Sequence, residues 1–146
     1  AEVCQKALGC HTMTLPMELN REELEVLIMH TPEIHWEWVI YEQPAVMISA
    51  QCVYKNHDKC EKRNATDLEF ANAHGDTYIV KAVCKECYNI IYQKKPISLL
   101  ERRYDLTRIR DYRIVLTTET GSQAEKILAF RPEGICQEGH YRKGIE

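Results

Sequence analysis

Long apolar runs are missing from this sequence. None approaches the roughly 20 residues of a transmembrane helix, so no membrane span is predicted. The first residues, from Ala1 to Cys4, show no charged segment followed by an apolar one, and we therefore expect no secretory signal. The sequence also lacks a large excess of charge of either sign, because it has 19 basic and 22 acidic residues and a net charge of −3. That balance argues against strong non-specific binding of nucleic acid.

Familiar catalytic motifs are absent as well. The sequence has no G-x-S-x-G nucleophile turn, no H-E-x-x-H metal-protease helix and no apparent pair of catalytic carboxylates. We therefore expect the chain alone to show no peptidase turnover. The remaining catalytic candidates are Cys52 as a nucleophile with His140 as its base, because such partners can lie far apart in sequence, and Arg142 as a binder of carboxylate. For His140, a solvated histidine is the alternative.

Cysteine, in contrast, is abundant. Four of the seven cysteines follow the spacing C-x7-C-x23-C-x2-C; they are Cys52, Cys60, Cys84 and Cys87. The C-x2-C pair has the spacing with which a tight turn directs two thiolates at one metal ion. An odd total would leave one cysteine unpaired in a secreted disulfide framework, so the cytoplasm is the favoured compartment, where clustered cysteines are more often metal ligands. The other three, Cys4, Cys10 and Cys136, are interpreted as ordinary thiols.

A hairpin is predicted between the two cysteine pairs, with strands at 68–70 and 77–80 and a turn at 72–76. It would bring all four cysteines together as ligands of one centre. All-thiolate ligation suits zinc or a [4Fe–4S] cluster, and the spacing does not separate the two. The alternative is that the cysteines are buried and reduced and pack as small hydrophobes. A redox pair of the thioredoxin kind is not favoured, because no helix begins after Cys84.

Apolar periodicity predicts strands that alternate with amphipathic helices. Asn20 and Glu23 have the spacing of a capping box at the start of a helix. The run 45–50 is continuously apolar, which is typical of a strand buried on both faces, and it leads to Cys52. Further strands are predicted at 35–41, 88–92 and 112–117. Further helices are predicted at 98–109 and from an N-cap at Ser122 through Phe130. This alternation indicates an α/β fold, and 146 residues fit a single domain.

Four stretches carry a resemblance to a known family: 17–20 (MELN), 44–52 (PAVMISAQC), 84–99 (CKECYNIIY, then PISL) and 139–146 (GHYRKGIE). In this order they resemble the carboxyl-terminal part of the collagenase-like peptidases, family 32 among peptidases of unassigned catalytic type. The resemblance covers nearly the whole chain. It implies a TIM-like α/β barrel, of which residues 1–146 supply the later βα units with the cysteine-bearing hairpin inserted. The chain would then be a single domain, the carboxyl-terminal half of a larger barrel protein.

The resemblance also implies a function. The family carries a peptidase label, and several of its branches are linked to hydroxylation of RNA bases or quinone precursors and hold a four-cysteine iron–sulfur cluster. On this hypothesis the four clustered cysteines bind a [4Fe–4S] cluster or zinc in a barrel enzyme that acts on RNA or a peptide. The alternative is a non-catalytic module in which a structural Cys4 zinc site supports binding of a protein or RNA partner.

Too few helices are predicted to cover both faces of these strands. An exposed apolar surface would then need a partner, either the remainder of the barrel or a second copy of the chain. We take the strand that carries Trp36 and Trp38 as the candidate contact.

Overall fold

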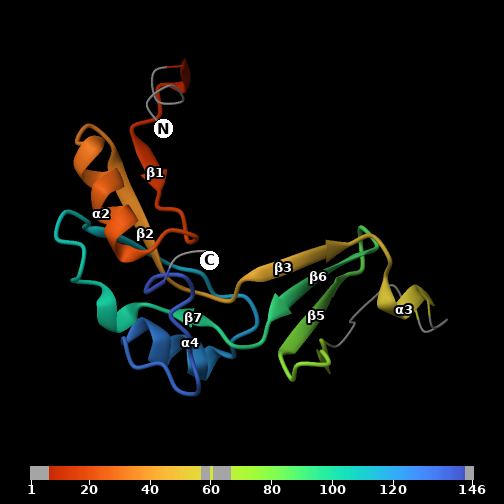
Figure 1. Cartoon of the computed structure of the whole chain (residues 1–146). Helices are drawn as coiled ribbons and strands as arrows, with labels where there is room; N and C mark the ends of the chain where they lie inside the picture. The colour runs from red at the N-terminus through yellow and green to blue at the C-terminus, as the bar shows by residue number, and fades with distance from the viewer. Residues whose placement is uncertain (1–6, 57–59, 61–66, 144–146) are drawn as a thin grey trace. The chain divides into compact units, whose positions relative to one another are not determined.

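The computed structural model describes residues 7–56, 60 and 67–143. Contacts divide the chain into two compact units (Figure 1). Unit 1 consists of Ala1–Glu42 and Ile97–Glu146, and unit 2 is the segment Gln43–Pro96. The sequence predicted one domain over residues 1–146; along the chain, unit 2 is inserted between the two parts of unit 1.

The sheet of unit 1 is built around one central strand, β2 (His35–Glu42). Strand β1 (Thr12–Thr14) and strand β8 (Asp111–Ile114) both pair with β2 in parallel. Strand β7 (Ile97–Ser98) pairs with the end of β2 in the antiparallel direction. Every other strand of this sheet therefore depends on β2 for its hydrogen bonds.

Helix α2 (Arg21–His30) connects β1 to β2 and begins with the predicted capping box. The Asn20 side chain accepts a hydrogen bond from the Glu23 N–H at 3.0 Å, and the Glu23 carboxylate accepts one from the Asn20 N–H at 2.8 Å. Leu24 and Ile28, one helical turn apart, are buried beneath the helix. The capping-box prediction is confirmed.

Alternate side chains of β2 enter the core of unit 1. Trp36 and Trp38 are 6% and 2% exposed, and Ile40 is fully buried. The Trp36 indole N–H donates to the Thr31 hydroxyl at 3.0 Å, so its polar atom is satisfied inside the core. The prediction that the tryptophan strand contacts a partner is therefore wrong, because both rings pack within unit 1 itself.

The segment predicted as a helix at 98–109 is instead β7 followed by a short 3-10 helix, η1 (Leu100–Arg102). The Leu99 N–H donates to the Ile40 carbonyl at 2.7 Å, which fixes the chain beside β2 where a helix was expected. The apolar positions that suggested the helix are still buried; they are Leu99, Leu100, Leu106 and Ile109. Helical spacing thus identified which residues are buried, but it predicted the wrong secondary structure for the segment.

The last helix, α4 (Gly121–Leu128), is capped by Thr120 and not by Ser122 as predicted. The Thr120 hydroxyl accepts from the Gln123 N–H, and the Gln123 side chain accepts from the Thr120 N–H at 2.8 Å. This reciprocal pair is a capping box that begins two residues earlier than expected.

Unit 2 contains a four-stranded antiparallel sheet in the order β3-β6-β5-β4. Its strands are β3 (Ala45–Ser49), β4 (Leu68–Ala71), β5 (Thr77–Val83) and β6 (Tyr88–Gln93). Strands β4 and β5 form the predicted hairpin, with a turn at 72–76 in which Gly75 adopts a positive φ of 87°. A short helix, α3 (Val53–Asn56), follows β3.

Strand β3 was predicted to be buried on both faces, and this prediction is wrong. It lies at one edge of the sheet, where it pairs with β6 alone. Val46, Met47 and Ile48 are 51%, 56% and 71% exposed. A continuous apolar run therefore marks an exposed edge strand here, and not the interior of a parallel sheet.

The predicted fold class, later βα units of a TIM-like barrel, is also wrong. The described part of the chain holds two sheets with eight strands in all, few helices and no closed barrel. Hairpins join β4 to β5 and β5 to β6, and all strands of unit 2 pair antiparallel, whereas a barrel needs a helix between successive parallel strands. A parallel crossover occurs at β1–α2–β2, within unit 1. Among the described residues, no helix has the length and apolar character that a membrane crossing requires.

The position of the α4 cap can be tested by two substitutions. Thr120→Ala should lower the free energy of unfolding by about 1 kcal/mol, because it removes the side-chain acceptor of the Gln123 N–H. Ser122→Ala is the matched control and should change stability by less than about 0.5 kcal/mol, since Ser122 lies inside the helix. Urea unfolding followed by circular dichroism measures both. A larger loss for Ser122→Ala would place the cap where the sequence predicted it.

Candidate functional site

Three of the four predicted ligand cysteines lie at one end of the sheet of unit 2. Strand β3 ends there, because Ser49 pairs with Asn89 near the start of β6. Strand β5 ends there as well, and β4 begins on the same side. Cys52 follows β3, Cys60 lies between β3 and β4, and the C-x2-C pair joins β5 to β6. The topology therefore brings Cys52, Cys84 and Cys87 to the same end of one sheet, where β3 and β5 end and β6 begins.

The C-x2-C pair forms a four-residue turn between paired strands. Val83 and Tyr88 face each other across the hairpin, and Cys84 and Cys87 are the first and last residues of the turn. The Cys87 thiol lies 3.7 Å from the Cys84 carbonyl oxygen. Cys87 has a φ of 60°, in the left-handed region where a residue other than glycine is held at a cost of roughly 1–2 kcal/mol. Such strain is kept at turns that have a function more often than elsewhere.

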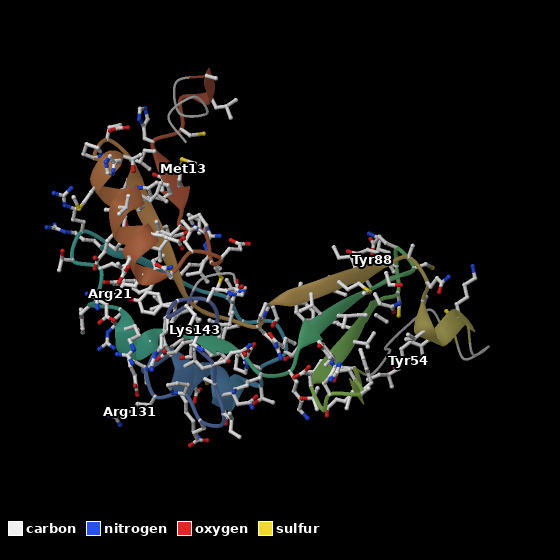
Figure 2. The ribbon with its side chains drawn as sticks, viewed as in Figure 1. Met13, Arg21, Tyr54, Tyr88, Arg131 and Lys143 are labelled. Carbon is white, nitrogen blue, oxygen red and sulfur yellow. The ribbon has the colours of Figure 1, made fainter. Side chains whose placement is uncertain are left out.

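A buried asparagine connects Cys52 to this turn. Asn89 is 1% exposed, and its side-chain amide donates to the carbonyl oxygen of Gln51. This bond ties the residue before Cys52 to β6, two residues after Cys87. Cys52 is itself 5% exposed. Figure 2 shows Tyr88, the first residue of β6 and the neighbour of Asn89, at this end of the sheet.

The four cysteines are not assembled into a metal centre in this structure. All four are free thiols; Cys60 and Cys87 are exposed and Cys84 is half-buried. Over the described ranges, no three His, Cys, Asp or Glu side chains are close enough together to hold a metal ion. Cys4 lies outside the described residues. The thiol chemistry and the position at one sheet end fit a thiolate-bound metal. The cysteine side chains are not within the distances that metal ligands need. The metal site therefore stays a prediction.

The alternative catalytic pair is divided between the two units. Cys52 belongs to unit 2, and His140 belongs to unit 1. Neither unit by itself therefore contains both members of the Cys52–His140 pair. Arg142, the third candidate, lies beside His140, and its guanidinium makes two contacts with the Glu138 carboxylate.

Arg142 contributes to a polar cavity of about 560 Å³ in unit 1. The cavity is lined by residues from three segments far apart in sequence: Asn20, Arg21, Glu22, Arg102, Asp105, Tyr141 and Arg142. The backbone N–H of Arg21 donates to the Tyr141 carbonyl at 2.9 Å, and the Tyr141 hydroxyl donates to the Asp105 carboxylate at 3.2 Å. These two bonds hold the three segments around the cavity.

Glu138 joins two of the cavity's arginines. Its carboxylate accepts from the Arg102 Nε at 3.1 Å and from a terminal nitrogen of Arg142 at 3.2 Å. Partial burial raises the pKa of Glu138, but hydrogen bonds from Arg142 and Arg102 outweigh it and leave the pKa below its usual value. Burial, and then the charge of Asp105, raise the pKa of Tyr141, so its hydroxyl stays neutral and can donate.

Sequence reasoning named Arg142 and the cysteines but missed several residues at both sites. Asn89, Glu138 and Arg21 were not singled out. The only local signal was the group 139–142 (GHYR), which marked the segment that closes the cavity. Comparisons with known protein families, with curated proteins and with solved structures find no match to this chain. Function must therefore be argued from the residues and their geometry.

The ion pairs of Glu138 should give a measurable dependence of stability on pH. A carboxyl group with a lowered folded pKa stabilises the fold above its unfolded pKa of about 4.3, and this stability is lost as the pH falls through the folded value. Glu138→Gln should therefore be less stable than the parent at pH 7, by about 1 kcal/mol or less because the group is partly exposed. The difference should disappear in acid.

Urea unfolding at pH values from about 2 to about 7, on both sides of the carboxyl pKa, measures the stability difference between Glu138→Gln and the parent. Glu133→Gln is the control, because Glu133 pairs with Lys126 on the exposed side of α4 and its removal takes away the same charge. A Glu138→Gln difference that stays constant across the range would contradict the assignment of Glu138 as a charged partner of the arginines.

Proposed function

We propose that unit 2 is a metal-binding module whose ligands are the thiolates of Cys52, Cys60, Cys84 and Cys87. The observation that carries this proposal is the strained C-x2-C turn, with Cys87 in the left-handed region, at the sheet end that also receives Cys52. A turn that needed no thiol would gain stability from glycine at this position. Retention of cysteine at a strained position supports a role for its sulfur.

The small core of unit 2 supports the same conclusion. Among the described residues of this unit, the buried side chains are those of Gln43, Cys52, Ile79, Val80 and Asn89. Two of these five are polar amides. Small sheets with so little apolar core are usually held together by disulfides, a metal or a partner. Because the six described cysteines are free, a metal is the cross-link that these residues offer.

Four thiolates suit zinc or a [4Fe–4S] cluster. A zinc ion with four protein ligands has no open position, so its role would be structural and the module would serve to bind a protein or RNA partner. A cluster would favour the enzyme role implied by the resemblance to collagenase-like peptidases, with RNA or a peptide as the substrate class. In both cases the thiols must be reduced, which supports a cytoplasmic location.

Metal analysis of protein purified without oxygen distinguishes these roles. Zinc at one ion per chain supports the structural module. Iron and sulfide in equal amounts, with brown colour, support the cluster. Protein that contains neither metal, and that binds neither after reconstitution under reducing conditions, would contradict the proposal.

Cobalt(II) titration tests the ligand set directly. Reduced protein should give the absorption of tetrahedral thiolate-bound cobalt, and zinc should displace it. Cys84→Ser should weaken binding by more than about 100-fold, beyond the 10–100-fold effect typical of an outer-shell partner. Cys136→Ser, in unit 1, is the matched control and should leave binding unchanged. Equal loss in both variants would mean that the metal is held elsewhere.

The strain at Cys87 gives an independent test. Cys87→Gly should raise the stability of the metal-free protein by about 1 kcal/mol, because glycine adopts a positive φ without a steric penalty. The same substitution should abolish metal binding, because it removes one thiolate. Urea unfolding in a chelator measures the first effect, and cobalt titration measures the second. Cys87→Ser is the control, since it removes the thiolate but keeps the side chain that causes the strain.

A further inference from the structure

The proposed metal module makes no use of the polar cavity of unit 1. We propose that this cavity binds a small organic carboxylate that carries a hydroxyl or ammonium group next to its carboxylate. The arginines at positions 21, 102 and 142 would receive the carboxylate, and Asp105 would receive the neighbouring donor.

The backbone segments around the cavity are held together before any ligand binds. The three segments are the start of α2, the end of η1 with the chain that follows it, and the turn that contains Tyr141. The backbone bond from Arg21 to Tyr141 and the bond from the Tyr141 hydroxyl to Asp105 connect these segments in pairs. A volume of about 560 Å³ lies within the roughly 300–1,000 Å³ that small-molecule sites occupy, and it exceeds what a bare ion needs. Binding therefore requires little ordering of the protein.

The cavity offers guanidinium donors that the protein itself does not use. Arg102 bonds to Glu138 through its Nε, and Arg21 bonds to Glu25 through its Nε at 3.1 Å. The terminal nitrogens of these two arginines make no hydrogen bond to any residue that the structure describes. A guanidinium has five N–H donors in a planar fork that matches a carboxylate. Figure 2 labels Arg21 on unit 1, at the start of α2.

The charges around the cavity select the kind of anion. The three arginines of the lining are matched by Glu22, Asp105 and the neighbouring Glu138 carboxylate, so the cavity has guanidinium donors but no surplus of positive charge. Glu22 and Asp105 also line the cavity and would repel an anion with two charges, such as phosphate. Asp105 already accepts from the neutral Tyr141 hydroxyl and has acceptor capacity left for a ligand donor. The arrangement therefore suits a singly charged carboxylate with an adjacent donor.

The test uses the whole chain and four probes, namely lactate, alanine, acetate and inorganic phosphate, with binding followed by calorimetry. Lactate or alanine should bind saturably and at least about tenfold more tightly than acetate, the equivalent of one charge-assisted hydrogen bond. Lactate above alanine identifies a hydroxy acid, and alanine above lactate identifies an amino acid. No saturable binding of either probe, or tighter binding of phosphate, would overturn the proposal.

Variants assign the residues. Arg102→Gln should weaken the better probe by about tenfold or more, because it removes a charged donor. Arg110→Gln, an exposed arginine outside the cavity lining, is the control and should bind as the parent does. Asp105→Asn can still accept from Tyr141, so the fold should persist, while the preference over acetate should shrink. The assignment would be contradicted if Asp105→Asn kept the full preference over acetate, or if Arg110→Gln weakened binding as much as Arg102→Gln. The Asp105→Asn measurement remains decisive if Arg102→Gln fails to fold.

Discussion

The shortage of buried apolar side chains in unit 2 is the constraint on which its other features depend. An antiparallel sheet is normally stabilised by one face packed on a core, yet the apolar side chains of edge strand β3 are more than half exposed. Hydrogen bonds between strands add little net stability on their own. The sheet therefore needs a cross-link or a cover. Cys52, Cys84 and Cys87 lie at the end where β3, β5 and β6 meet, which is where a cross-link would connect the most strands.

Unit 1, in contrast, is stabilised by a well-packed apolar core. Its central strand places Trp36, Trp38 and Ile40 in one core, and truncation of either ring to alanine would cost about 3–5 kcal/mol. The Trp38 ring packs against Tyr141, with ring centroids 5.5 Å apart. Because Tyr141 also bonds to α2 and to Asp105, the core fixes the cavity as well. The packing of Tyr141 against Trp38 thus stabilises both the core of unit 1 and the walls of its polar cavity.

Features that depend on nearby residues could be predicted from the sequence, and features that depend on strand pairing could not. The capping box of Asn20 and the hairpin around Gly75 are local, and both were identified. The apolar run 45–50 was assigned to a buried strand because periodicity reports the character of a segment and not its neighbours. Its edge position follows from pairing with β6, about 40 residues later, which periodicity cannot reveal. The barrel prediction failed for the same reason.

In the candidate sites, too, local features could be predicted from the sequence and contacts between distant residues could not. The C-x2-C spacing predicted the turn at Cys84, whereas Asn89 became visible only through its bond to Gln51, 38 residues earlier. Glu138 likewise gains its importance from Arg102, 36 residues away. Each proposed site is built from residues of one unit, so each ligand would stabilise the unit that holds it. For unit 2 this matters most, because a sheet with little core gains a larger share of its stability from a bound metal than a well-packed one does.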